Sequence, residues 1–317
     1  MVKHTAAAPT RVPALRYLRR NYDLYLLLLP GIAYLLLFKY APLYGLLIAF
    51  TDFDIFAGNS PFHAIFVSEW VGGYHFQRVM GSPAFIRVLT NTLIISLYKL
   101  VFLFPLPILL AILLNEVRNV TLKRSFQTLV YLPHFLSWVI VSGLFLNLLG
   151  AGGIVNRVLM GLGRETPIYF FMESSLFRGL LIVTDGWKTV GWGSIVYLAA
   201  ITAIDPQLYE AAIVDGASRL RQTISITLPG IMPTVVLLLI LNIGNLLQAG
   251  FEQILTMYNP LVYDVADIIQ TYVYRIGLGQ LNFSMGTAVG LFNSVVAFTL
   301  IISANAFSRR AIGRSIW

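Results

Sequence analysis

Polar side chains interrupt the long apolar stretches of this sequence, and they are the residues able to do chemistry there. Asn242, Asn245 and Gln248 recur every three residues in one stretch, and Asn293 lies in the next one. Amides supply both the donors and the acceptors that hydroxyl groups need, and sugar rings stack on aromatic faces. Aromatic faces are available from Trp187, Trp192 and Tyr197. Recognition of a hydroxyl-rich ligand is one interpretation; the other is that the amides join helices and the aromatic residues form interfacial belts.

Two charged residues, Asp185 and Lys188, stand three positions apart in another apolar stretch. Charges inside a membrane are costly and usually face a bundle interior or a pathway. At this spacing the two side chains share one helix face, so we expect them to neutralise each other. The alternative is that Lys188 faces a pathway and attracts an anionic sugar. For Lys39 and Lys99 we expect contacts with the membrane surface or with neighbouring carbonyl groups.

Signatures of catalysis are missing from the sequence. It contains no Gly-x-x-x-x-Gly-Lys-Ser/Thr phosphate loop, no His-Glu-x-x-His metal motif and no cysteine. These motifs would supply a phosphate cradle, a zinc site or a thiolate ligand. We therefore expect no catalytic residue, no metal ligand and no cofactor in this chain, and we do not expect it to be an enzyme.

Composition shows which elements must position these residues. The chain is 57% hydrophobic and 11% charged, with a mean hydropathy of +0.77, whereas a soluble domain carries about a quarter charged residues. Long apolar runs between short polar connections are typical of an all-α, polytopic helical membrane protein. Six spans are expected, at about 24–50, 88–114, 128–149, 178–201, 231–249 and 286–307. The fourth is the weakest by hydropathy.

The distribution of basic residues predicts the orientation. With six spans, 13 of the 22 Lys and Arg residues lie on the side of the termini and six on the other. The positive-inside rule then places both termini in the cytoplasm, with the protein in the bacterial inner membrane. Most of the net charge of +8 therefore reflects topology, and we expect no nucleic acid partner. The domains are a cytoplasmic tail at 1–23, a membrane domain at 24–307 and a second cytoplasmic tail at 308–317.

The segment 205–233, between the fourth and fifth spans, has strong helix signals. Asp205 followed by Pro206 is an N-cap with proline at the first helical position. Gly216 interrupts the helix, and a second short helix is expected over 217–226. Small and polar residues on the first helix would let another surface approach the backbone closely. The candidates for this contact are Glu210, Ala211, Ala212, Asp215 and Gly216.

This loop resembles the EAA signature of the permease subunits of ABC importers. The resemblance rests on Glu210-Ala211-Ala212, on Gly216, and on Ile-Thr-Leu-Pro at 226–229. It implies a type I permease fold in which the loop forms a coupling helix, set into a groove of a nucleotide-binding subunit. Glu210 and Asp215 would then make polar contacts at that interface, and Gly216 would permit the turn. The aromatic residue often found midway in the motif is replaced around Thr223.

Further segments are similar to the oligosaccharide branch of that family, including permeases for aldouronate-type and alginate oligosaccharides. They read FKYAPLYG at 38–45, YLPHFLSW at 131–138, GWK at 186–188, IDP at 204–206 and SRR at 308–310. The resemblance implies a second permease subunit, two ATPase subunits that bind ATP and magnesium, and an extracytoplasmic sugar-binding protein. The outer loop 52–87 either helps to receive that binding protein or simply caps the bundle.

Two other classes of protein remain possible from the residues. An ATP-independent secondary transporter or channel would need clustered intramembrane carboxylates for a coupling ion, and Asp185 is the acid within the predicted spans. A scaffold or enzyme of envelope polysaccharide synthesis would need a pair of catalytic acids on a cytoplasmic domain. Neither pattern is visible in the sequence.

Overall fold

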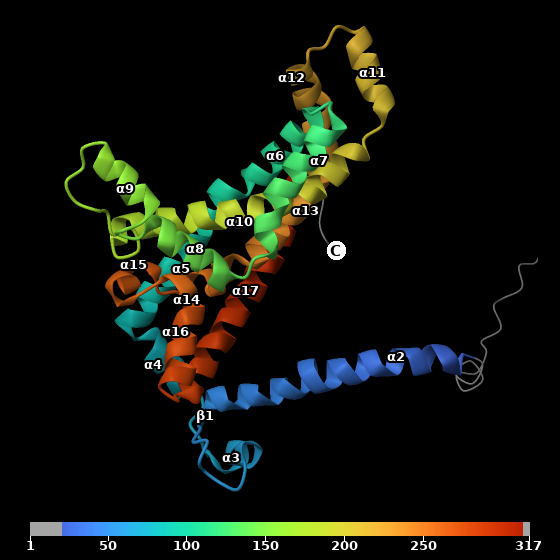
Figure 1. Ribbon diagram of the computed structural model, residues 1–317. Coiled ribbons are helices and arrows are strands. Elements are labelled where there is room, and N and C mark those ends of the chain that lie inside the picture. Colours follow the sequence, from blue (N-terminus) through green and yellow to red (C-terminus); the bar gives the residue numbers. More distant parts are fainter. Residues whose placement is uncertain (1–20, 313–317) are drawn as a thin grey trace, which may run out of the picture.

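The computed structural model describes residues 21–312, and helices make up most of this part of the chain (Figure 1). The first half contains α2 (Tyr22–Leu35), α3 (Pro61–Val67), α4 (Tyr74–Met80), α5 (Pro83–Leu103), α6 (Pro105–Glu116), α7 (Val120–Tyr131), α8 (Trp138–Leu149) and α9 (Ile154–Gly161). The second half contains α10 (Ser174–Thr202), α11 (Pro206–Val214), α12 (Arg219–Gln222), α13 (Leu228–Gly244), α14 (Phe251–Met257), α15 (Tyr263–Ala266), α16 (Ile269–Val273) and α17 (Phe283–Ile312).

Short segments of 3-10 or π-helix extend or join these helices. They are η1 (Leu36–Tyr40), η2 (Ala41–Phe50), η3 (Leu132–Phe135), η4 (Thr223–Thr227), η5 (Leu246–Gln248), η6 (Pro260–Val262) and η7 (Tyr274–Gly279). Two strands of two residues each, β1 (Thr51–Asp52) and β2 (Glu69–Trp70), pair antiparallel. They close the outer loop at the end of η2, where Trp70 stacks on Phe50.

Five helical stretches in the described part of the chain are long and apolar enough to cross a membrane. They are Tyr22–Phe50, Pro83–Glu116, Trp138–Gly161, Arg219–Gly244 and Phe283–Phe307. The predicted fourth span, 178–201, lies within α10, which has 29 residues and is therefore about 44 Å long. α10 is not among the five apolar stretches, which agrees with the weak hydropathy of the predicted fourth span. The last stretch belongs to α17, which continues to Ile312, inside the expected C-terminal tail.

The course of the chain supports α10 as a crossing helix. Ser174, at its start, donates to Asp264 of α15, and its other end leads directly into α11. In Figure 1, α15 and α9 lie at one end of the bundle, and α11 and α12 project from the other end. Arg219 of α12 lies 3.5 Å from Glu116 at the end of α6. The two ends therefore carry the loops that the predicted topology assigns to opposite sides.

The predicted third span, 128–149, was wrong as a continuous helix. α7 ends at Tyr131, a short 3-10 segment follows, and α8 begins only at Trp138, with Ser137 as its N-cap. Pro133 has no backbone N–H to give to a helical hydrogen bond, which favours a break there. Freed carbonyl groups at membrane depth need other donors, and a side chain of α10 supplies them, as described below.

The predicted fifth span, 231–249, also differs at both ends. α13 starts three residues earlier, at Leu228, and ends at Gly244. Ala249 and Gly250 then adopt the left-handed conformation, with φ of 48° and 86°, and the chain turns into α14. The amides of the predicted 242–248 series therefore lie where the helix ends and the chain reverses.

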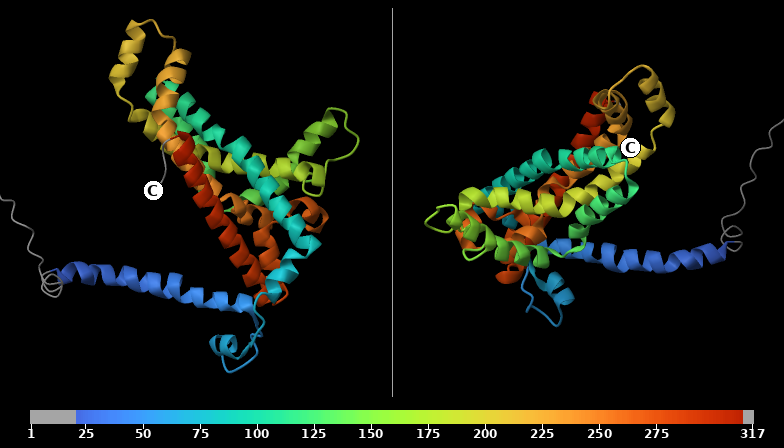
Figure 2. Two further views of the ribbon diagram at one scale, coloured as in Figure 1. Left: turned by 180° about the vertical axis from the view of Figure 1, so that it is seen from behind. Right: turned by 45° about the horizontal axis from the view of Figure 1, so that its top comes forward.

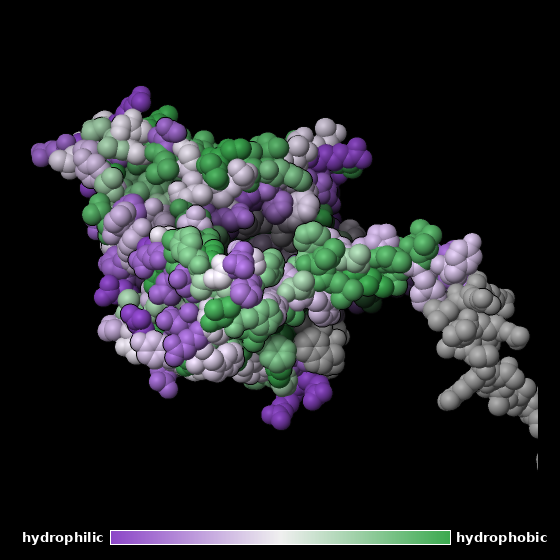
Figure 3. All heavy atoms as spheres, turned by 90° about the horizontal axis from the view of Figure 1, so that it is seen from below, coloured by the Kyte–Doolittle hydropathy of each residue, from purple (hydrophilic) through white to green (hydrophobic). Residues whose placement is uncertain are grey.

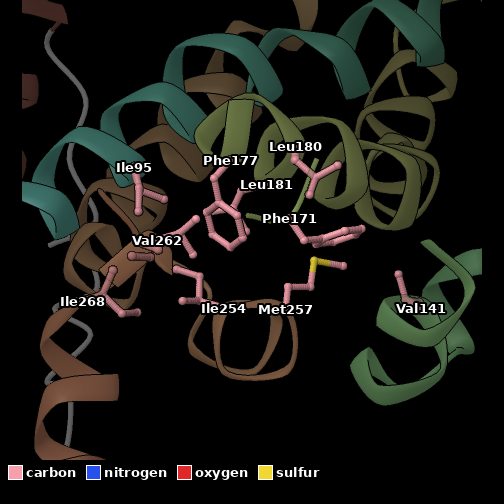
Figure 4. Close-up of a cluster of buried hydrophobic side chains, with 12 residues drawn as sticks. Ile95, Val141, Phe171, Phe177, Leu180, Leu181, Ile254, Met257, Val262 and Ile268 are labelled. Atoms are coloured by element: carbon pink, nitrogen blue, oxygen red, sulfur yellow. The ribbon is translucent and has the colours of Figure 1, made fainter. Parts of the chain in front are cut away.

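The largest buried cluster surrounds α10 near the end that carries α15. Phe177 and Leu181 of α10 point toward Ile254 of α14 and Val262 of η6 (Figure 4). A second cluster near the α11 end joins α10 to α6 and α13 through Ala111, Tyr197, Ile201 and Ile231. α10 thus forms part of the packing at both ends of the bundle.

The N-terminal helix α2 with η1 diverges from the bundle as an arm (Figures 1 and 2), whereas η2 at its base packs against α17. α2 and η1 contain no buried residue, and the space-filling view shows the arm as an apolar rod (Figure 3). Such side chains require lipid or another protein around them. The arm is therefore consistent with a membrane helix rather than with a surface helix in water.

Candidate functional site

The loop after α10 forms the helix that its residues predict. Asp205 accepts a hydrogen bond from the backbone N–H of Gln207 at 2.9 Å, and Pro206 occupies the first helical position. At the other end Gly216 has φ of 74°, and the N–H of Ala217 donates to Ala212 O at 2.8 Å. This is a Schellman ending, which uses a left-handed residue to satisfy the last carbonyl groups. The predicted start and interruption are both confirmed.

α11 stands clear of the rest of the molecule. It contains no buried residue, and Leu208 and Val214 are 53% and 87% exposed. Glu210, Ala211 and Asp215 are exposed as well, whereas Ala212 is half-buried. Together with α12, α11 makes a hairpin that projects beyond the ends of α6 and α13 (Figure 1). The shape leaves one whole side of a short helix free for another surface.

Contacts at the base of this hairpin join it to the bundle. The hydroxyl of Tyr209 lies 2.9 Å from that of Thr227, directly before α13. A Cβ atom at Gly230 would meet the Ile204 side chain at 2.6 Å, so α13 approaches the start of α11 closely. Tyr209 was not among the residues predicted for this loop, although it is the aromatic residue of α11. A displacement of α11 would therefore reach both α10 and α13.

A cavity of about 440 Å³ lies between α5, α6, α10, α13 and the turn that follows α13. Four residues of the predicted ligand set line it: Tyr197, Asn242, Asn245 and Gln248. Asn242 and Asn245 donate to carbonyl groups of their own helix, Leu238 and Leu241, so these bonds do not join helices. The cavity is the place where the structure brings predicted binding residues together.

The expected Asp185–Lys188 pair was wrong. Asp185 faces the cavity and pairs with Lys99 of α5, with Oδ2 and Nζ 2.8 Å apart. Lys99 also donates to Oε1 of Gln253 at 2.5 Å, and Gln253 in turn donates to Thr184. Lys99 was expected to reach the membrane surface or bond carbonyl groups. Instead its partner is a carboxylate on another helix, because two opposite charges inside a bundle are least costly when they meet.

Lys188 points away from that cavity, toward the break in the third crossing. It is 7% exposed and donates to the carbonyl oxygens of His134 and Leu136 at 2.7 and 2.6 Å. Its ammonium also lies 5.6 Å from the centre of the Trp138 ring. In this conformation Lys188 stabilises the break and does not face the cavity.

The remaining predicted ligand residues lie elsewhere. Trp187 packs against Phe145, and Trp192 stacks on His134 with the ring centres 4.4 Å apart; neither lines the cavity. Asn293 lines a second cavity, of about 580 Å³, together with Gln270 of α16. The side-chain oxygens of Asn293 and Gln270 are buried, with no hydrogen-bond partner within residues 21–312. The predicted set is therefore divided between two cavities and the opposite side of α10.

A further ionic cluster, which was not predicted from the sequence, lies at the end of the bundle that carries α15. Arg275 of η7 pairs with Asp267 at 2.6 Å and lies 4.8 Å from the centre of the Tyr263 ring. Asp267, 4% exposed, also accepts from Thr271. Burial raises the pKa of the neighbouring Tyr258 to about 12. The cluster fixes the turn between α15 and α16. Within the described residues, no group of three or more His, Cys, Asp or Glu side chains is placed to hold a metal ion.

A helical membrane bundle, with an exposed capped helix at one end and a cavity lined by several polar side chains between its helices, is the architecture of a membrane transport subunit. The chain belongs to the family described as "Binding-protein-dependent transport system inner membrane component", which matches residues 104–313. The family predicted from the loop at 210–229 is thereby confirmed. This family is a transport component, and the match covers the α11 hairpin and the part of the cavity wall that α6, α10 and α13 supply, but not the part from α5.

Relatives match over nearly the whole chain. The polygalacturonan/rhamnogalacturonan transport system permease protein YteP of Bacillus subtilis (strain 168) is 48% identical over 93% of this chain and 90% of its own length. The protein LplB of the same organism is 46% identical over 92% of this chain and 90% of its own length. A chain of a bacterial alginate ABC transporter, in complex with an alginate pentasaccharide-bound periplasmic protein, is 41% identical. It superposes with a TM-score of 0.86 over 96% of this chain and 99% of that chain, which confirms the predicted permease fold.

Proposed function

We propose that this chain is one of two permease subunits of an ATP-driven ABC importer of oligosaccharides. It forms part of the translocation pathway and couples it to a separate ATPase. The observation that carries this proposal is α11: an exposed helix, capped at both ends, joined directly to α10 and hydrogen-bonded to Thr227, which directly precedes α13. The family match supports the transport role.

The partners follow from the same proposal. Two ATPase subunits bind ATP and magnesium, and α11 docks on one of them through Glu210, Ala211, Ala212 and Asp215. A second, different permease completes the pathway, and an extracytoplasmic binding protein delivers the sugar. The alginate transporter, which was solved with a periplasmic protein, supports this last partner. Both termini lie in the cytoplasm of a bacterial cell and the chain crosses its inner membrane, as the excess of basic residues on that side supports.

The substrate class is supported by the names of the relatives. Polygalacturonan, rhamnogalacturonan and alginate are the sugars for which these transporters are named. We therefore propose an oligosaccharide that contains uronic acid units. A family match to binding-protein-dependent transport favours this function over an ATP-independent transporter or channel.

Coupling through α11 is testable in the assembled importer. Glu210→Lys should lower the ATPase activity that the sugar-loaded binding protein stimulates by about tenfold or more, since loss of a charged contact within an interface costs about 2–5 kcal/mol. Glu165→Lys makes the same charge change at an exposed position of the loop after α9 and should leave stimulation unchanged. The two purified complexes are compared in proteoliposomes, with subunit content checked by gel filtration. Normal stimulation and assembly in Glu210→Lys would remove α11 from the coupling path.

A further inference from the structure

The cavity beside α10 has a mainly apolar wall with several polar side chains, and this wall carries no net charge. Of the described residues that line it, Lys99 and Asp185 are the charged ones, and they pair with each other. The remaining polar groups in the wall are neutral amides and hydroxyls from α5, α10 and the end of α13. A ligand in this cavity therefore meets hydrogen-bonding groups rather than a net electrostatic attraction.

Lys99 has little freedom to serve an anionic ligand. Its ammonium has two acceptors, Asp185 Oδ2 and Gln253 Oε1, and its side chain is only 13% exposed. A Cβ atom at Gly250 would collide with Lys99 Nζ, and Gly250 has φ of 86°. The turn after α13 is thus shaped to admit the ammonium group at this position. A carboxylate entering the cavity would have to compete with Asp185, and its own charge would be repelled by Asp185.

One hydroxyl in the wall lacks a partner. Ser96 is 5% exposed and lines the cavity one turn before Lys99 on α5. Its Oγ is buried and has no hydrogen-bond partner among the residues that the structure describes. Buried hydroxyl groups are rarely left in this state, so the group is available to a ligand. On the other side Asn242, Asn245 and Gln248 each offer both donors and acceptors.

We propose that this cavity is a subsite for an uncharged, hydroxyl-bearing sugar ring, and that Asp185 sets the preference by neutralising Lys99. The subsite deepens the proposed function and rests on it. A volume of about 440 Å³ lies within the usual range for small-molecule sites. In an oligosaccharide with both neutral and uronic units, the uronic units lie outside this cavity.

The test uses two trisaccharides with the same linkage, trigalacturonate and its carboxyl-reduced, neutral counterpart. Binding of each is measured by calorimetry to the complete importer in lipid nanodiscs, without the binding protein, whose own specificity would mask that of the cavity. The wild-type importer should bind the neutral sugar about tenfold or more tightly than the acid, because a carboxylate would lose its hydration in the cavity and find the ammonium group of Lys99 already paired. Preference for the acid would overturn the proposal. Binding of neither sugar would also overturn it.

Three variants separate the contributions. Asp185→Asn releases the charge of Lys99 and should strengthen trigalacturonate binding about tenfold, the effect of one charge-assisted hydrogen bond. Asp185→Asn combined with Lys99→Met should lose that gain. Ser96→Ala should weaken both sugars several-fold and equally, since a hydroxyl partner is lost. An unchanged preference in Asp185→Asn, or unchanged affinities in Ser96→Ala, would overturn the assignment.

A control keeps the two proposals apart. Stimulation of the ATPase by the sugar-loaded binding protein is recorded on every preparation. If stimulation is normal while neither trisaccharide binds the nanodiscs, the subsite fails and the import function stands. If an Asp185→Asn complex does not assemble, Asp185→Asn with Lys99→Gln keeps an uncharged hydrogen-bonding pair between α5 and α10. This variant also carries no net charge at the pair and should keep the preference for the neutral trisaccharide, and a preference for the acid would count against the proposal.

Discussion

The ammonium group of Lys188 lies 2.6 Å from the carbonyl oxygen of Leu136, at the break between α7 and α8. The same group donates to His134 O at 2.7 Å, so one side chain of α10 satisfies two acceptors that a continuous helix would have satisfied itself. An unpaired lysine at membrane depth and two unpaired carbonyl groups are each costly. The contact removes both costs, and it joins α10 to the third crossing.

Replacing Lys188 should destabilise the protein, because its ammonium group donates to two carbonyl groups at the break between α7 and α8. Lys188→Met removes two hydrogen bonds to a charged donor, each worth about 1.5–3 kcal/mol, and leaves both carbonyl groups without it. We expect the thermal unfolding midpoint of the detergent-solubilised chain to fall by several degrees. The unfolding midpoint of Lys188→Arg, which keeps the charge and the hydrogen-bond donors, should fall less. Equal midpoints for Lys188→Met and wild type would show that the break does not depend on this side chain.

A close crossing of α10 and α7 makes Gly191 a sensitive position. A Cβ atom at Gly191 would collide with the backbone carbonyl of Val130, and Gly191 is buried. Gly191→Ala should therefore cost about 1–3 kcal/mol, as overpacking does. Gly179→Ala is the matched control in the same helix, because nothing lies within 4 Å of its Cβ position. There alanine should be neutral or stabilising by up to about 1 kcal/mol. Thermal unfolding of the two variants compares them, and equal midpoints would contradict the close crossing.

Local signals allowed the docking loop to be predicted from the sequence almost completely. Asp205 with Pro206 starts a helix and Gly216 ends it through interactions within a few residues, so neither depends on the rest of the fold. The amides at 242, 245 and 248 were predicted as a group for the same reason: spacing of three places them on neighbouring turns. They line one cavity, as one of the two interpretations requires.

The partners of Asp185 and Lys188 could not be predicted because they lie on segments that are distant in sequence. Asp185 and Lys188 share a helix face by spacing, yet Lys99 and Leu136, 86 and 52 positions away, provide their partners. The carbonyl groups of the break at 132–137 likewise find their donor, Lys188, on a distant helix. Hydropathy alone predicts a continuous span over 128–149, because it carries no information about which side chain can donate to a free carbonyl group.

The hydrogen bond between Tyr209 and Thr227 predicts a separation of assembly from coupling. Tyr209→Phe removes only the hydroxyl that lies 2.9 Å from Thr227 Oγ1, a loss of about 0.5–1.5 kcal/mol. We expect α11 to keep its fold and the complex to assemble, while stimulated ATP hydrolysis drives less uptake per ATP consumed. Uptake of labelled sugar and phosphate release are measured together in proteoliposomes. An unchanged ratio would show that this bond does not transmit the movement of α11.

The left-handed conformation of Gly216 gives the most direct test of how α11 ends. Nothing lies within 4 Å of the Cβ position at Gly216, so a larger residue meets no obstacle and the cost comes from φ of 74° alone. Gly216→Val should cost about 1–2 kcal/mol or more, the penalty of a left-handed conformation for an L-residue, and the helix end should shift to relieve it. Gly216→Asn should be milder, because asparagine tolerates this conformation.

The expected result is graded loss of coupling without loss of the bundle. Stimulated ATPase activity should fall in the order wild type, Gly216→Asn, Gly216→Val, while the thermal unfolding of the membrane domain stays nearly constant, because α11 contributes no buried residue. The order distinguishes a backbone effect from a steric one, since valine and asparagine are similar in size. Equal losses for the two variants would indicate that size at this position matters and that the partner surface contacts Gly216 itself.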